Sequence, residues 1–182
     1  SELRKSLPNS SALAQISRKA WSYVRYVALR ELPPEVFAFD PAPEDPRPML
    51  GYAITRDAMY WTPADRDLDK VVWAIGRIRD YLANQGVNLL VVPIPDKEQV
   101  YRERIPRSAW INDIEPPASM LPELVARLQA KGIPAVSLLP VYREQAASGA
   151  ELYWRDDTHW SADGIRVAAE LIAAELRDTM AP

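Results

Sequence analysis

The fold is constrained most by one stretch, the apolar run Val87-Asn88-Leu89-Leu90-Val91-Val92-Pro93. Such a short, nearly unbroken run is typical of a parallel strand that is buried on both faces. A second run, Ala135-Val136-Ser137-Leu138-Leu139-Pro140, follows a helix predicted over about 119–131. Gly86 and Gly132 precede the two runs, so helix, glycine, short apolar strand and loop occur twice in succession. This alternation predicts an α/β fold with parallel strands.

Three further segments have apolar residues at helical spacing. The first covers residues 10–30, the second starts at a cap on Asp65 or Asp67 and ends at Gly86, and the third covers about 162–178. Their apolar positions are Leu13, Ile16, Ala20, Val24 and Val27; then Leu68, Val71, Val72, Ile75, Ile78 and Leu82; and finally Ile165, Ala168, Ala169, Leu171, Ile172 and Leu176.

The remaining segments carry weaker patterns. Residues 33–49 are rich in proline and acid and predict an irregular loop, whereas residues 50–61 predict a short hairpin around Thr55-Arg56-Asp57. A short helix is expected over 141–148, and irregular structure over 102–117. The length of 182 residues fits one domain. We divide it into an N-terminal helix and Pro-rich loop (1–49), a hairpin and helix (50–86) and an α/β unit (87–182).

The composition excludes several classes of function. The chain is 48% apolar and 26% charged with a net charge of −3, so nucleic acid is not an expected partner. No apolar run approaches the ~20 residues of a membrane span. The lack of cysteine and the single histidine argue against disulfides and zinc, and no metal or cofactor is expected. Because the chain opens on Ser1-Glu2, we expect that a leader, tag or upstream domain has been removed.

The single histidine lies in Tyr153-Trp154-Arg155-Asp156-Asp157-Thr158-His159-Trp160-Ser161-Ala162-Asp163-Gly164. A carboxylate beside an imidazole can hold the ring in one tautomer and stabilise its charged form. The sequence therefore offers His159 as a general base, with a carboxylate two or three residues before it. The alternative is that the acidic residues only cap the following helix and that His159 is an ordinary surface or core residue.

Polar residues follow both predicted strands. Ligands of open α/β sheets bind beyond the carboxyl ends of the strands. We therefore expect one site at that edge, formed by Asp96, Lys97 and Tyr101 after the first run and by Tyr142, Arg143, Asp157 and His159 after the second.

Two segments resemble the SGNH hydrolase superfamily, and within it the branch of the alginate O-acetyltransferases and their relatives. Residues 152–160 with Gly164 are close to that branch's Tyr-Tyr-x-x-Asp-Thr-His-Trp…Gly motif. Residues 91–97 with Tyr101 are similar to its strand-Pro-x-Pro-x-Lys-x-x-x-Tyr element. The resemblance covers roughly 87–178. It implies a flavodoxin-like, three-layer αβα fold with a parallel sheet, of which we expect this chain to hold only a part.

The resemblance also implies roles for individual residues. His159 would deprotonate a serine and later protonate the leaving group. Asp157 would orient His159, because Asp-x-His is the spacing of this branch. Asp156 competes for that role, since Asp-x-x-His is used more widely in the superfamily.

Four neighbours have less certain roles in this comparison. Trp160 would pack under the site, line a substrate groove or simply belong to the core. Lys97 would face the site or be merely exposed, and Tyr101 would line the site. Ser161 is expected to cap the helix that follows rather than to act as a nucleophile.

The nucleophile itself is not identified. Its Gly-Asp-Ser-type turn is absent from the sequence, and so are Gly-x-Ser-x-Gly and Gly-Thr-Ser. We therefore expect the serine to lie outside these residues. The resemblance implies an enzyme that transfers or removes an acetyl group on a carbohydrate hydroxyl, in the periplasm or another extracytoplasmic compartment. Alternatives are a non-catalytic module that binds a polysaccharide or an envelope protein partner, and an assembly domain of a cell-envelope polymer system.

Overall fold

The computed structural model describes residues 31–42, 45–62 and 67–180, together with 16–17, 20–21 and 23–25. The elements in chain order are β1 (Val36–Ala38), β2 (Leu50–Tyr52), α2 (Ala53–Ala58), α3 (Leu68–Ala83), α4 (Lys97–Val100), α5 (Leu121–Ala130), α6 (Leu139–Ala147) and α7 (Ala162–Met180), with the 3-10 turns η3 (Arg102–Arg104), η4 (Arg107–Ala109) and η5 (Ile111–Asp113) between α4 and α5. The helix predicted over 10–30 lies largely outside the described residues.

The helices predicted from periodicity after residue 62 are confirmed. Helix α3 begins after Asp67, whose side chain accepts a hydrogen bond from the backbone N–H of Lys70. Beyond its end lies Gly86 at φ +72°, a left-handed conformation that glycine adopts without strain. Helices α5 and α7 lie within about two residues of their predicted positions, and α6 covers most of the short helix expected over 141–148.

The hairpin predicted over 50–61 is wrong, and the loop predicted over 33–49 contains a strand. β2 pairs antiparallel with β1, placing Phe37 opposite Gly51, and α2 follows β2 directly. The ring of Phe37 occupies the space that a side chain at Gly51 would need. This pairing depends on an aromatic residue that packs onto a glycine from a distant segment, which no local alternation pattern reports.

The two apolar runs lie side by side but form no regular sheet within the described residues. The Val91 N–H donates to Pro134 O at 2.9 Å, and the Val136 N–H donates to Val91 O at 3.0 Å, which is a parallel arrangement. The burial expected on both faces is not found, since Val87 is 48% exposed. The second run ends early because α6 begins at Leu139.

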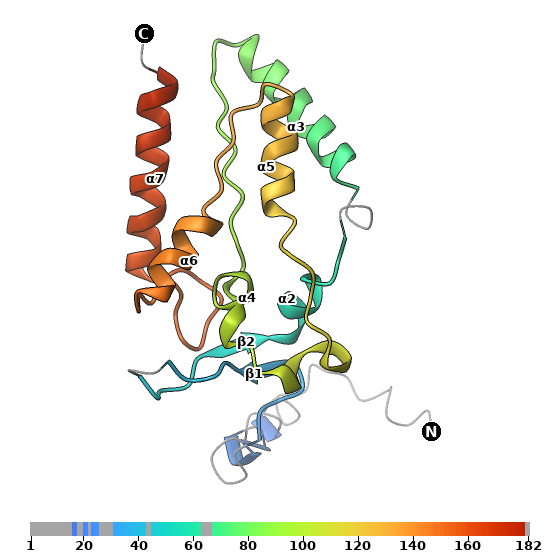
Figure 1. Ribbon diagram of the computed structural model, residues 1–182, viewed down its shortest axis with the longest axis vertical. Helices are drawn as coiled ribbons and strands as arrows, with labels where there is room; N and C mark the ends of the chain where they lie inside the picture. The colour runs from blue at the N-terminus through green and yellow to red at the C-terminus, as the bar shows by residue number, and fades with distance from the viewer. Residues whose placement is uncertain are drawn as a thin grey trace.

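The arrangement of these parts fits an α/β chain without showing a parallel sheet. Figure 1 shows the two extended segments running between α7 on one side and α3 with α5 on the other. The regular strands of the described residues are β1 and β2, which form a two-stranded antiparallel sheet near one end. The parallel sheet of the flavodoxin-like fold therefore stays a prediction.

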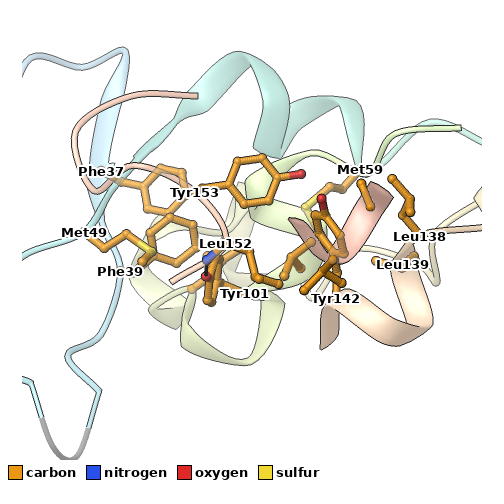
Figure 2. Close-up of a cluster of buried hydrophobic side chains, with 14 residues drawn as sticks. Phe37, Phe39, Met49, Met59, Tyr101, Leu138, Leu139, Tyr142, Leu152 and Tyr153 are labelled. Atoms are coloured by element: carbon orange, nitrogen blue, oxygen red, sulfur yellow. Dashed lines mark hydrogen bonds between the residues drawn. The ribbon is translucent and has the colours of Figure 1, made fainter. Parts of the chain in front are cut away.

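The larger hydrophobic core joins β1 and β2 to the C-terminal half of the chain. Figure 2 shows Tyr101, Leu152 and Tyr153 in the middle of this cluster, with Phe37 and Phe39 toward one end. Tyr101 and Tyr153 meet edge to face, with ring centroids 6.4 Å apart. Leu152 and Tyr153 are buried whereas Trp154 is exposed, so the chain leaves the core at the start of the acidic segment.

Candidate active site

The acidic segment is the closed end of a narrow antiparallel loop. Tyr153 and Trp160 form an antiparallel bridge. The Trp154 N–H donates to His159 O at 3.0 Å, and the Ser161 N–H donates to Leu152 O at 3.0 Å. These bonds bring the two sides of the loop together and leave the residues between Trp154 and His159 at its tip.

Asp157 and His159 interact at this tip. Asp157 Oδ1 accepts a hydrogen bond from the His159 backbone N–H at 3.1 Å, which is the geometry of an Asx turn. The same oxygen lies 2.6 Å from His159 Nδ1. One carboxylate oxygen thus holds both the backbone and the ring of a residue two positions later, which gives a local physical reason for the Asp-x-His spacing.

The ionisation of the Asp157 carboxyl group determines which nitrogen of the His159 ring carries a proton. The hydrogen bonds from His159 hold the pKa of Asp157 below its ordinary value, so this carboxyl group is ionised at neutral pH. An ionised carboxylate can only accept, and therefore Nδ1 carries the proton of the Asp157–His159 bond. In the neutral ring Nε2 is then the unprotonated nitrogen that can take a proton from another group.

The pair is open to solvent. The side chain of His159 is 82% exposed and that of Asp157 is 51% exposed. Within the described part of the chain, Nε2 of His159 has no hydrogen-bond partner. An exposed pair of this kind adds little to the stability of the fold, but a group presented from outside the loop can reach it.

Asp156 takes no part in this pair. It is exposed, and among the described residues it makes no hydrogen bond or ion pair. Asp156 acts on the loop electrostatically, since its negative charge favours the protonated form of Lys97. The geometry thus separates the two carboxylates that the sequence left as alternatives.

Lys97 is neither on an open face nor merely exposed. Its side chain is 1% exposed, and its ammonium donates to the carbonyl oxygens of four residues. These acceptors are Leu50 at 2.7 Å, Trp154 at 2.7 Å, Arg155 at 3.0 Å and Asp157 at 2.9 Å. Burial lowers the pKa of Lys97 to about 8. Lys97 therefore lies under the loop and contacts its backbone.

Tyr101 also lies inside the protein rather than beside the pair. Its hydroxyl donates to Ala150 O at 3.1 Å and accepts from the Leu152 N–H at 2.9 Å. Burial raises the pKa of this phenol, which stays neutral at physiological pH. Tyr101 thus fastens the chain where it enters the loop.

Trp160 and Ser161 fasten the other side of the loop. The Trp160 indole N–H donates to the Tyr153 hydroxyl at 3.1 Å, and the Trp160 ring packs edge-on against Tyr142. Trp160 therefore lies at the edge of the hydrophobic core, beneath the site. Ser161 Oγ accepts from the Gly164 N–H at 3.1 Å and bonds to Glu151 O. The prediction of a helix cap at Ser161 is confirmed.

Two contacts from the N-terminal half were not foreseen. The Leu50 N–H donates to Arg155 O at 2.7 Å, and Arg155 forms an ion pair of 2.5 Å with Asp45. Arg155 and Asp45 are 110 positions apart; Asp45 belongs to no recognisable motif, and Arg155 stands at an unspecified position of the Tyr-Tyr-x-x-Asp-Thr-His-Trp motif. No signal in the sequence links them, because the contact exists only once β1 and β2 have packed under the loop.

The surroundings hold one sizeable cavity and no metal centre in the described region. The cavity measures about 530 Å³ and is lined by residues that include Asp45, Tyr101 and Arg155, but not by the Asp157–His159 pair. Within those same described stretches, no three His, Asp or Glu side chains are grouped to hold a metal ion. Across the same residues, no helix has the length and apolar content needed to cross a bilayer.

The Asp-x-His loop that leads into α7 fits the class of SGNH hydrolase-like proteins, and a comparison with protein families shows that class. A family model described as "SGNH hydrolase-like domain, acetyltransferase AlgX" matches residues 55–182, and the chain belongs to this family. No solved structure matches the chain.

Curated relatives are similar over part of their length. One is a probable alginate O-acetylase AlgJ of Pseudomonas aeruginosa, 33% identical over 132 residues that cover 71% of this chain and 32% of the relative. Another, the protein of the same name from Pseudomonas fluorescens, is 27% identical over 117 residues that cover 63% of this chain and 28% of the relative. The chain thus spans about a third of the length of the curated relatives it matches.

Proposed function

We propose that this chain supplies the acid–base part of a serine-dependent carbohydrate O-acetyltransferase or O-acetylesterase of the SGNH type. In this proposal His159 Nε2 takes the proton of a serine hydroxyl as that oxygen attacks an acetyl ester. The imidazolium then returns the proton to the departing alcohol. Asp157 fixes the tautomer and stabilises the imidazolium that forms.

One observation carries the proposal, namely the 2.6 Å contact between His159 Nδ1 and Asp157 Oδ1. It leaves an unprotonated, solvent-facing nitrogen on a loop braced by a buried ammonium. The family membership and the relatives named as probable alginate O-acetylases support a carbohydrate acceptor, with alginate or a similar uronate polymer as the first substrate to test. They equally support an extracytoplasmic location.

The serine is the missing part of this mechanism. Ser161, the serine next to the pair in sequence, uses its hydroxyl to cap α7 and to bond Glu151. The chain matches about a third of the length of its relatives. We therefore propose that the nucleophile comes from a segment beyond the one that holds the pair.

The test uses a longer protein that holds this segment together with the proposed serine. It measures acetyl release from p-nitrophenyl acetate and from acetylated mannuronate oligosaccharides, together with acetyl transfer to the unmodified oligosaccharide. His159→Ala should lower each rate by at least about a hundredfold, because general-base help contributes roughly 10²–10⁴. Arg166→Ala, on the exposed face of α7, is the matched control and should keep full rates. Undiminished rates in His159→Ala would refute the proposal.

A second candidate is a non-catalytic module that binds a polysaccharide. It is favoured by one observation, the engagement of the Ser161 hydroxyl in the backbone of the loop. Calorimetry with mannuronate oligosaccharides separates the two candidates. In the longer protein that holds the proposed serine, binding without any acetyl release or transfer would favour the module, whereas turnover that depends on His159 would exclude it.

A further inference from the structure

A buried ammonium whose hydrogen-bond partners are all backbone carbonyls is an unusual polar arrangement, although the charges of Glu98, Asp156 and Asp157 also favour its protonated form. A buried lysine ordinarily pairs with a carboxylate, because removing a charge from water costs several kcal/mol. Within the described part of the chain Lys97 makes no ion pair. Its four partners are the carbonyl oxygens of Leu50, Trp154, Arg155 and Asp157, all within 3.0 Å.

Three of these four carbonyls belong to the loop that carries the pair. Carbonyls of residues 154, 155 and 157 can point at one atom only if the backbone curls around it. The curl places the backbone of Asp157, and the Asp157 carboxylate then closes the turn on His159. The fourth carbonyl belongs to Leu50 in β2, so the same ammonium also ties the loop to the sheet.

Backbone hydrogen bonds also hold the loop, and one of them reaches its tip, since the Asp157 N–H donates to Trp154 O at 3.5 Å. The Trp154 N–H to His159 O bond closes the base of the loop, and the Leu50 N–H to Arg155 O bond holds its outer side. Lys97 is the side chain that contacts the backbone of Asp157 itself. Lys97 is the first residue of α4, whose start is capped by the bond from the Asp96 N–H to Gln99 Oε1 at 2.9 Å.

We infer that Lys97 is the positioning residue of the Asp157–His159 pair. Its ammonium curls residues 154–157 into the turn that aims the Asp157 carboxylate at the imidazole. This inference rests on the proposed function, in which the Asp157–His159 pair acts as acid and base. The inference itself concerns the geometry of the pair, which can be measured without turnover.

The experiment uses NMR, for which a single histidine gives one unambiguous set of ring signals. The ¹⁵N shifts of the ring report which nitrogen carries the proton, and the ¹³C signal of the Asp157 carboxyl reports its pKa. Lys97→Met keeps the length and volume of the side chain without its charge. Lys70→Met removes an exposed lysine and serves as the matched control.

In the wild type and in Lys70→Met, the ring should hold its proton on Nδ1 and the pKa of Asp157 should lie below its ordinary value. In folded Lys97→Met, the preference for the Nδ1–H form should fall by about tenfold, the loss expected for one charge-assisted hydrogen bond. The pKa of Asp157 should rise toward its ordinary value. An unchanged tautomer and an unchanged Asp157 pKa in a folded variant would overturn the inference.

A chemical variant covers the case in which Lys97→Met does not fold. The sequence has no cysteine, so Lys97→Cys introduces the single thiol of the chain. After alkylation in denaturant and refolding, an S-aminoethyl group restores an ammonium of nearly the same reach, and an S-ethyl group gives its neutral match. We expect the aminoethyl form to recover the Nδ1–H tautomer and the ethyl form to lack it.

The remaining outcomes are also decisive. If both neutral variants are unfolded while the aminoethyl form folds, Lys97 is an anchor of the whole fold and the positioning role is overturned. If the pair stays intact without Lys97, the positioning role fails but the proposed function stands. If the wild type itself shows no Asp157–His159 bond, the geometry behind both proposals fails.

Discussion

Asp157 illustrates how much chemistry a two-residue spacing can encode. Its Oδ1 accepts from the backbone N–H of His159 and contacts the ring of the same residue. An Asx turn is a local structure, so Asp-x-His can be recognised in a sequence without knowledge of the fold. Asp156, at the other spacing, makes no hydrogen bond or ion pair among the described residues.

The two carboxylates should therefore differ in function. We expect Asp157→Asn to lower the rate of acetyl transfer by about 10²–10⁴, because an amide at this position no longer favours the Nδ1–H tautomer. Asp156→Asn should change the rate less than about threefold, since it leaves the Asx turn intact. Initial rates on the same oligosaccharide compare the two variants. Equal losses would contradict the assignment.

Lys97 makes the stability of the chain depend on pH in an alkaline window. Burial lowers the pKa of Lys97 from 10.5 to about 8, so between these values the unfolded chain holds a proton that the folded chain has released. The free energy of unfolding contributed by this residue therefore rises with pH across the window. We expect urea unfolding to show a gain of about 2 kcal/mol between about pH 8 and pH 10 relative to Lys97→Met, because each unit of pKa difference corresponds to about 1.4 kcal/mol.

The control for this measurement is Lys70→Met. The hydrogen bond to Asp67 raises the pKa of Lys70, so this exposed lysine is protonated in both states throughout the window. Wild type and Lys70→Met should therefore show the same slope. Equal slopes for wild type and Lys97→Met would show that the ammonium is not destabilised by its site.

Helix α7 shows what an element contributes to the site. Its start is pressed against the loop, and a Cβ on Gly164 would overlap the carbonyl oxygen of Leu152. The Tyr142 hydroxyl donates to Gly164 O at 2.6 Å from the opposite side. Position 164 therefore requires glycine, because the start of α7 lies too close to the backbone of Leu152 to accommodate a side chain.

This close approach predicts opposite effects for two substitutions of the same kind. Gly164→Ala should destabilise the chain by at least about 2 kcal/mol, since either the loop or α7 must move. Gly76→Ala, within α3, meets its nearest atom at 3.8 Å and should stabilise by about 0.5–1 kcal/mol through its helix propensity. Thermal unfolding of both variants checks this, and a neutral Gly164→Ala would be inconsistent with the packing described.

Elements with local causes were predictable, and elements with distant causes were not. The helical periodicity and the ends of α3, α5 and α7 depend on residues that are close together in the sequence. The Asx turn at Asp157 is local in the same sense. The pairing of β1 with β2 was not predicted, because it depends on a contact between Phe37 and Gly51, which are separated in the sequence by a loop. The burial of Lys97 under the loop was not predicted, because the residues around it in the sequence do not indicate which backbone carbonyls will surround its ammonium.

At the scale of the molecule, the N-terminal half supports a loop that lies in the C-terminal half. Both β1 and β2 precede the region matched by the family, yet Leu50 donates to Arg155 and accepts from Lys97. The Glu98 carboxylate accepts from the Tyr52 N–H at 2.8 Å, which adds a second tie from α4 to β2. The site thus depends on contacts that span most of the described chain.

This dependence should be visible in hydrogen exchange. Arg155→Ala removes the ion pair with Asp45 and the hydrogen bond to Arg47 O, so exchange should become roughly fivefold faster both in β2 and in residues 154–157. Arg166→Ala is the control, because its pairs lie within the exposed face of α7. Faster exchange confined to the loop would mean that the two halves are not coupled.

Helix α3 also leaves apolar surface uncovered. Of the six positions in the predicted stripe, Leu68 and Val72 are buried and Ile75 and Leu82 are partly buried, whereas Val71 and Ile78 are exposed. Trp73 and Tyr81, outside that stripe, are exposed as well. Periodicity correctly gave the helix, but it could not report how much of the stripe finds a partner.

The most direct test of the pair is the ¹⁵N spectrum of the His159 ring, recorded at neutral pH for the wild type, Asp157→Asn and Asp156→Asn. We predict a ring protonated on Nδ1 in the wild type and in Asp156→Asn, with that preference lost in Asp157→Asn. A wild-type ring protonated on Nε2, or a preference that survives Asp157→Asn, would contradict the assignment of Asp157 and His159 as the acid–base pair.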